Sequence, residues 1–187
     1  MAATRDELLE VTFPVEPGPV SEDARALVLS LFDRHRTGMH RYVLSFGLDA
    51  GESEDVVQEA FLALWRHVRR DGDRSNLAGW LFRVAHHQAL TRRGRTRRRE
   101  RLAARAPRLV ATGVETPEER LAALERRARL RAVVGALPAR DRRCLELRAE
   151  GLRYREIAGV LGVSLGTVAA TLTRVLARLR RADETGA

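Results

Sequence analysis

Apolar residues recur every three or four positions in long segments of this 187-residue chain, and no segment shows the strict alternation typical of a half-buried strand. One such segment runs from Ala24 to Phe46, with Leu27, Leu31 and Tyr42 among its apolar positions. This spacing places the apolar side chains on one face of an α-helix. The sequence therefore predicts an all-α protein.

Two further helices are expected in the first half of the chain. Gly47 and Gly51 are expected to end the first helix and open a turn, and Ser53 is a favourable N-cap for the next helix. After the polar segment "RDGDRS", Asn76 is a candidate N-cap for a third helix, whose buried stripe includes Trp80. The first half is thus expected to pack three helices together.

An arginine-rich segment divides the chain. Residues 92–101 read "RRGRTRRRER", which no hydrophobic core accommodates, and the apolar pattern lapses from there to Val114. Pro107 and Gly113 fall in this interval, as expected for a linker. We therefore predict two small helical domains joined by a flexible linker. Their bounds are a flexible arm over 1–23, a first domain over 24–104, the linker over 105–115, a second domain over 116–182 and a tail over 183–187.

The second domain contains the spacing of a helix-turn-helix. Thr116 begins a capping-box pattern, and Pro138 separates two expected helices upstream of the motif. In the last part, "GLRYREIAGVLGVSLGTVAATLTRVLARLRR", Gly162 suits a tight turn, Ser164 an N-cap and Val168 the start of a core stripe. Because cap, turn and stripe agree in register, a DNA-binding motif is favoured over a plain helical hairpin.

The net charge of +9 is distributed unevenly along the chain. Residues 1–60 carry a net charge of −7, residues 61–106 carry +10 and residues 107–187 carry +6. A basic middle attracts a polyanion that an acidic front repels, so the charges indicate two kinds of partner.

Composition argues against several other classes of protein. No apolar run reaches about 18 residues, the length of a membrane span, and the N-terminus lacks the charged and then apolar segments of a signal peptide. We therefore expect a cytoplasmic protein without a membrane partner. The single cysteine, Cys144, cannot form an internal disulfide, and no Cys/His cluster has the spacing of a zinc site. We accordingly predict no metal and no cofactor.

Two segments resemble the extracytoplasmic-function (ECF) group of bacterial sigma factors. The back half, "ALPARDRRCLELRAEGLRYREIAGVLGVSLGTV", is similar to the sigma C-terminal domain, and the front half, with "EDVVQEAFLALWRH" and "NLAGWLFRVAHHQALTRRGRTRRR", to the ECF N-terminal domain. Together the similarity covers about residues 25–104 and 116–181, in the family's order. The resemblance implies a non-enzymatic subunit that binds core RNA polymerase, recognises the minus-10 and minus-35 promoter elements and helps to open DNA.

The resemblance also assigns partners to parts of the chain. It implies contacts with the clamp helices of the polymerase largest subunit and with the beta-subunit flap, contacts with double- and single-stranded promoter DNA, and an anti-sigma factor as a candidate partner. The helix over residues 54–67 matches the clamp-binding helix of the family. Its candidate polymerase contacts are Asp55, Gln58, Glu59, Phe61 and Trp65.

The third helix and the loop before it match the minus-10 and melting elements of the family. Captured bases need pockets or stacking surfaces beside a positive groove for the single strand. The candidate residues for this element are Asp71, Asp73, Arg74, Ser75, Arg83, His86, His87, Arg92, Arg93, Arg95, Arg97, Arg98 and Arg99. His87 and Thr91 stand where relatives commonly have Asn and Asp, so the family's base preference does not transfer.

The helix that starts at Ser164 matches the minus-35 reader. Relatives usually have Lys-Ser-Arg after "GTV", whereas this chain has Ala169-Ala170-Thr171, which leaves a small, nearly neutral reading face. An A/T-tolerant or shape-based reading is expected, because alanine packs on thymine methyl groups. The candidate contacts are Arg153, Arg155, Ser164, Gly166, Thr167, Ala169, Ala170, Thr173, Arg174 and Arg178.

Two other functions fit parts of the sequence. A stand-alone helix-turn-helix regulator would bind duplex DNA without polymerase, but would not need the pattern of the front domain. A metal-dependent nuclease built on His86 and His87, or on His35 and His40, lacks carboxylate and histidine residues at metal-ligand spacing.

Overall fold

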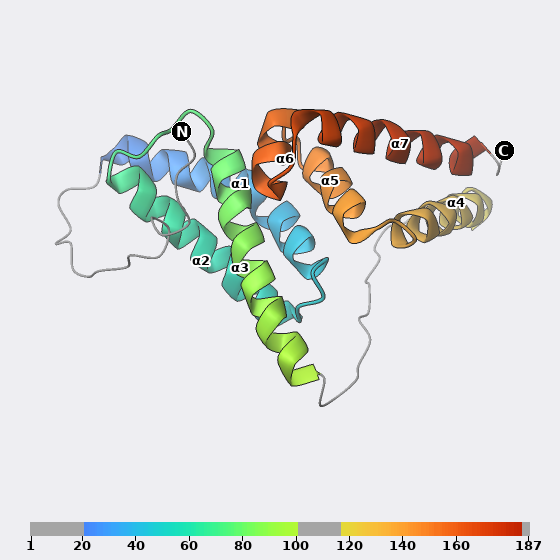
Figure 1. Cartoon of the computed structure of the whole chain (residues 1–187), viewed down its shortest axis with the longest axis horizontal. Coiled ribbons are helices and arrows are strands. Elements are labelled where there is room, and N and C mark those ends of the chain that lie inside the picture. Colours follow the sequence, from blue (N-terminus) through green and yellow to red (C-terminus); the bar gives the residue numbers. More distant parts are fainter. Residues whose placement is uncertain (1–20, 101–116, 185–187) are drawn as a thin grey trace.

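The computed structural model describes residues 21–100 and 117–184, with side chains for residues 21–95 and 124–184. These ranges form seven α-helices and no strand, which confirms the predicted all-α fold (Figure 1). The expected linker and residues 1–20 of the expected arm lie outside them. The predicted arm extends too far, because the first helix already starts at Glu22. The exposed Ser21 precedes this helix, whose first turn is acidic.

The first three helices form one packed unit. They are α1 (Glu22–Leu44), α2 (Ala50–Arg69) and α3 (Leu77–Glu100), and α1 and α3 both contact α2. Fully buried side chains from all three meet in its core, namely Met39, Tyr42, Val43, Leu64, Leu81 and Phe82. Asn76 caps α3 as predicted, since its side-chain oxygen accepts a hydrogen bond of 3.0 Å from the Gly79 backbone amide.

The start of α2 differs from the prediction. The N-cap is Asp49, not Ser53, and Asp49 forms a reciprocal capping box with Glu52. Gly51 therefore lies inside the helix, and only Gly47, with φ of 82°, has a turn conformation. Ser53 lies on the buried face of α2, where it has no side-chain hydrogen bond. The reciprocal capping box starts the helix one turn earlier than the isolated serine suggested.

The other four helices are α4 (Pro117–Gly135), α5 (Ala139–Ala149), α6 (Tyr154–Leu161) and α7 (Leu165–Glu184). Helices α6 and α7 meet at 107°, within the range of a helix-turn-helix. Gly162 between them has φ of 64°, and the Ser164 hydroxyl accepts a 3.1 Å hydrogen bond from the Thr167 amide. Val168 and Leu172 are buried. The predicted motif is therefore confirmed in turn, cap and stripe.

No single helix of the described ranges is long and apolar enough to cross a membrane. Helices α6 and α7 would satisfy length and composition together, but they are the bent pair of the helix-turn-helix.

The two halves of the chain pack against each other. Helix α6 lies against α3 and α5 lies against α1, while α4 and α7 run side by side away from this contact (Figure 1). One continuous cluster of buried residues includes Met39 and Phe82 from the first half and Leu147 and Ile157 from the second. The described helices therefore share a core across the predicted domain boundary.

Candidate functional site

The outer face of α2 carries the predicted polymerase contacts, with one exception. Asp55, Gln58 and Glu59 are exposed, and Trp65 is half-buried. Phe61 is only 7% exposed, and its ring packs edge-on against Phe32 with centroids 5.0 Å apart. The prediction for Phe61 is therefore wrong: this side chain joins α2 to α1 and does not belong to the outer face.

Arg92 connects the acidic face of α2 to α3. Its guanidinium pairs with the carboxylate of Glu59 and, at 3.3 Å, with that of Asp55. It also donates a 3.2 Å hydrogen bond to the backbone carbonyl of Glu52. The side chain is only 21% exposed. Arg92 therefore neutralises the predicted polymerase face, and the prediction that it holds DNA phosphates is corrected, since its donors are already engaged.

The loop before α3 has a fixed shape. Asp73 accepts hydrogen bonds of 2.9 Å from both the amide and the hydroxyl of Ser75, and these bonds lower the pKa of its carboxyl group. Asp71 has φ of 52°, which is uncommon outside glycine. Arg74 bridges the Asp71 carboxylate and the Val68 carbonyl. All four predicted loop residues are exposed, on a loop whose own hydrogen bonds hold it in place.

An aromatic pair supports this loop from behind. Trp80, at the start of α3, stacks on the ring of His67 with centroids 4.6 Å apart, and His67 Nε2 is 2.9 Å from the carbonyl oxygen of Asp73. Trp80 is half-buried, so it packs beneath the loop, as the sequence favoured, and does not form an open stacking platform.

The two neighbouring histidines of α3 have different environments. His87 is exposed, whereas His86 is 6% exposed and its Nδ1 lies 2.6 Å from the hydroxyl oxygen of Tyr42. Burial, with a smaller contribution from Arg143, lowers the pKa of His86 to about 4, so its ring is neutral at neutral pH. The predicted DNA contact by His86 is therefore corrected, because it shares the inward face of α3 with Phe82.

The basic end of α3 is described in part. Arg83 and Arg95 are exposed and Arg93 is half-buried. The side chains of Arg97, Arg98 and Arg99 lie outside the described residues, although their backbone belongs to α3.

The reading face of α7 agrees with the geometry expected from the sequence. Gly166, Thr167, Ala170 and Thr173 are exposed, and Ala169 is half-buried. Around them, Arg153, Arg155 and Arg178 are exposed. Arg174 is exposed too, but it pairs at 3.0 Å with Asp141 of α5.

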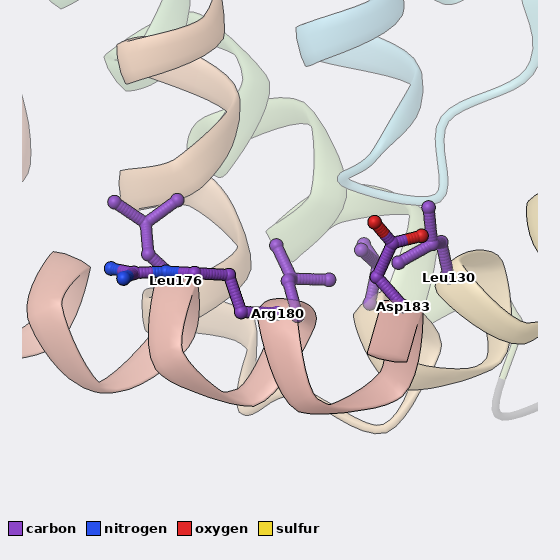
Figure 2. A pocket seen from close by; sticks show the side chains of 6 residues that line it. Leu130, Leu176, Arg180 and Asp183 are labelled. Atoms are coloured by element: carbon purple, nitrogen blue, oxygen red, sulfur yellow. The ribbon is translucent and has the colours of Figure 1, made fainter. Parts of the chain in front are cut away.

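Sequence reasoning missed an apolar groove on the second half of the chain. Between α4 and α7 lies an open hollow of about 410 Å³, with Asp183 at one end (Figure 2). Asp183 also forms an ion pair with Arg126 of α4. The signal was present, since α7 has more leucines than its core stripe requires, and Leu176 is 39% exposed. The groove is lined by Leu130, Val134, Leu176, Leu179, Arg180 and Asp183.

Within the described ranges, no three His, Cys, Asp or Glu side chains come together as metal ligands. The arrangement consists of an acidic helix face, a basic helix behind a structured loop, and a helix-turn-helix. These are features of a protein that binds macromolecules.

Comparison with family models and curated proteins agrees with this description. Residues 31–99 match the model of sigma-70 region 2, and residues 127–179 match the model of sigma-70 region 4. The ECF RNA polymerase sigma factor SigL of Mycobacterium tuberculosis is 32% identical over 157 residues, which cover 83% of this chain and 88% of that protein. SigK of Mycobacterium bovis is 27% identical and covers 83% of this chain and 85% of SigK.

Solved structures show the same fold. The sigma factor RpoE, in complex with the anti-sigma factor NepR from Bartonella quintana, superposes with a TM-score of 0.62 at 17% identity, covering 84% of this chain and 96% of RpoE. CnrH, in complex with the cytosolic domain of CnrY, superposes with a TM-score of 0.52 at 24% identity, covering 87% of this chain and 91% of the CnrH chain.

Proposed function

Because this chain belongs to the ECF group of sigma-70 factors, which bind core RNA polymerase and recognise promoters, we propose that its three exposed surfaces divide this work between them. The observation that carries the proposal is the separation of charge between α2 and α3. The acidic residues of α2 face outward, while α3 exposes arginine and histidine. One surface is therefore suited to a basic protein partner and the other to nucleic acid.

The α2 face is the proposed contact for the clamp helices of the polymerase largest subunit. Asp55, Gln58 and Glu59 present it, with Trp65 at its half-buried edge. Arg92 pairs with the carboxylates of Asp55 and Glu59, so these two negative charges already have a counter-charge before a partner binds. A basic partner helix would replace Arg92 as the counter-charge of the two carboxylates.

The loop over 71–75 and the exposed side of α3 are the proposed minus-10 and melting surface. A loop held by its own hydrogen bonds can receive an unstacked base with little ordering cost. Arg83, His87 and Arg95 lie on the adjoining helix, where cations can attract the phosphates of a single strand. The arginines beyond residue 95 extend this basic helix in sequence.

The start of α7 is the proposed minus-35 reader. Its exposed face of glycine, alanine and threonine lets the backbone approach the major groove but offers no bidentate donor for guanine. Arg153, Arg155 and Arg178 around it would hold phosphates. Upstream recognition would therefore depend on shape and on thymine methyl groups.

The leucine-lined groove between α4 and α7 is the proposed binding site for the beta-subunit flap, since it is an open apolar surface on the same half as the reader. An anti-sigma factor is a further proposed partner, because the sigma factor RpoE, which shares this fold, is seen in complex with the anti-sigma factor NepR. The chain would act in the cytoplasm as a binding subunit and not as an enzyme.

Run-off transcription with core polymerase on genomic fragments tests the proposal. Transcripts that appear only when both core polymerase and this chain are present are the expected result. Specific binding of the chain alone to duplex promoters, with no transcript, would instead support a stand-alone regulator.

A further inference from the structure

Helix α5 and its C-cap residue, Glu150, contact the C-terminal part of α1 through two carboxylates. Glu150 forms an ion pair of 2.9 Å with Arg41, and Glu146 accepts a 2.8 Å hydrogen bond from the hydroxyl of Ser45. Both glutamates are half-buried, although each lies about 100 residues from its partner in the chain. These bonds join the two halves of the protein directly.

The surface of α1 is shaped to receive this helix. Gly38 lies in the middle of α1 and is buried, and a Cβ atom added there would overlap the carboxyl group of Glu150. Glycine inside a helix costs roughly 0.5–1 kcal/mol relative to alanine, so its presence here has a local cost. Just past the end of α1, the Arg143 guanidinium lies over the ring of Phe46 at 4.1 Å from the centroid. Polar, apolar and backbone contacts therefore follow one another along the last part of α1.

The same contact involves the melting helix. A Cβ atom added to Gly159 of α6 would lie 2.7 Å from the Arg83 guanidinium of α3. Gly159 is five residues before Ser164, the cap of the reading helix, and five residues span at most about 18 Å. The proposed minus-10 and minus-35 surfaces are thus held close together.

A promoter requires a much larger separation of these surfaces. Two elements about 25 base pairs apart, at about 3.4 Å per base pair, are separated by about 85 Å along straight duplex. The packed arrangement cannot place α3 on one element and α7 on the other. The halves must come apart before both elements are bound.

We propose that the face of α5 and α6 is an autoinhibitory interaction surface whose partner is the α1–α3 face of the same chain. The interdomain contact, formed by Gly38, Arg41, Ser45, Glu146, Glu150 and the Arg83–Gly159 approach, keeps the free protein closed. It leaves the acidic face of α2 uncovered, so polymerase can bind first and the halves separate afterwards. Only the inhibitory consequence rests on the proposed function, because the contact itself exists without polymerase or DNA.

The interdomain contact is also sensitive to pH. Glu146 is faced by Ser45 and Tyr42 from α1 and by Arg142 and Arg143 from its own helix. Burial raises the pKa of Glu146 from 4.5 to about 7, against the opposing effects of Ser45 and the two arginines. A raised pKa means that closing takes up a proton. The closed form is therefore most stable below the ordinary pKa of a glutamate and loses this stability as pH rises through about 7.

A reversible crosslink tests the proposal in the full-length chain. A Cβ atom at position 38 would overlap the Glu150 carboxyl group, which lies about 2.5 Å from the Cβ atom of Glu150. Replacing both residues, Gly38→Cys and Glu150→Cys, therefore brings the two Cβ atoms near the separation of about 3.5–4.5 Å found in a disulfide. We expect the pair to oxidise quantitatively in the free protein, whereas each single variant, with Cys144 buried, stays reduced. Failure of the pair to oxidise would overturn the closed contact.

The crosslinked protein is then assayed with core polymerase, with and without reductant. The expected result is at least tenfold less promoter opening in the oxidised form, restored by reduction. Equal opening in both forms would overturn autoinhibition. If the reduced form opens no promoter, the proposed function fails, and the oxidation result still decides the contact independently.

A substitution gives a second, independent readout. Gly38→Glu places bulk and negative charge against Glu150, while Thr37→Glu adds the same charge at the adjacent exposed position. With dyes on Ser30→Cys and Ala132→Cys, both exposed, we expect Gly38→Glu to shift the free protein to lower energy transfer and Thr37→Glu to leave it unchanged. An unchanged value for Gly38→Glu would contradict the proposal.

Discussion

Replacing Arg92 by alanine tests which arginines of α3 stabilise the fold and which bind DNA. Arg92 has three acceptors on α2: two carboxylates and one backbone carbonyl. Hydrogen bonds to charged groups contribute about 1.5–3 kcal/mol, but exposed ion pairs contribute less than about 1 kcal/mol. The Asp55 and Glu59 side chains are 65% and 51% exposed, so we expect Arg92→Ala to lower the free energy of unfolding by about 1–2 kcal/mol.

Arg92→Ala should leave the salt dependence of DNA affinity unchanged. Each phosphate contact contributes about 0.7–0.9 to the slope of log affinity against log salt. Arg95→Ala, the exposed matched control, should lower the slope by about that amount without a loss of stability. The measurements are urea unfolding of the free chain and fluorescence anisotropy of holoenzyme on promoter DNA from 50 to 200 mM salt. A slope that falls equally in both variants would refute the assignment of Arg92 to α2.

Three further predictions follow from single contacts. Ser164→Ala should lower the free energy of unfolding in urea by about 1 kcal/mol, because the Thr167 amide loses its hydrogen-bond acceptor, and Ser164→Asp should retain that stability. Equal loss of stability in both variants would contradict the capping role. Leu176→Glu should weaken holoenzyme assembly at least about tenfold in gel filtration with core polymerase, since it charges the apolar groove; unchanged assembly would remove the groove as a docking site. The closed form should lose at most about 3 kcal/mol of stability as pH rises from 4.5 to about 7, followed by energy transfer, and a pH dependence that persists in Glu146→Gln would contradict this.

Local signals in the sequence were sufficient to predict most of the helices. Asn76, Gly162 and Ser164 act within one turn of the chain, so their turn and capping roles follow from residue type and spacing alone. The predicted start of α2 was wrong because residue type favoured Ser53 as the N-cap, whereas Asp49, four residues earlier, also has a side chain that can cap a helix. Only the reciprocal bond between Asp49 and Glu52 decides between them.

Contacts between distant residues explain the errors in the candidate site. His86 and His87 are adjacent in sequence, yet one lies against Tyr42 and the other is exposed, which depends on how α1 packs on α3. Arg92 sits among arginines of similar spacing, and only the position of α2 distinguishes it. The interdomain contact joins residues about 100 positions apart, such as Ser45 and Glu146, which no local pattern reveals.

The most direct test of the account is detection of promoter opening by permanganate reactivity of unpaired thymines. Core polymerase, this chain and a promoter fragment identified by run-off transcription are combined, and each protein is also omitted in turn. The account predicts reactive thymines in the minus-10 region only when both proteins are present, and loss of reactivity when Arg83 and His87, both exposed on α3, are replaced together by alanine. Opening by core polymerase without this chain, or opening unaffected by the double replacement, would contradict it.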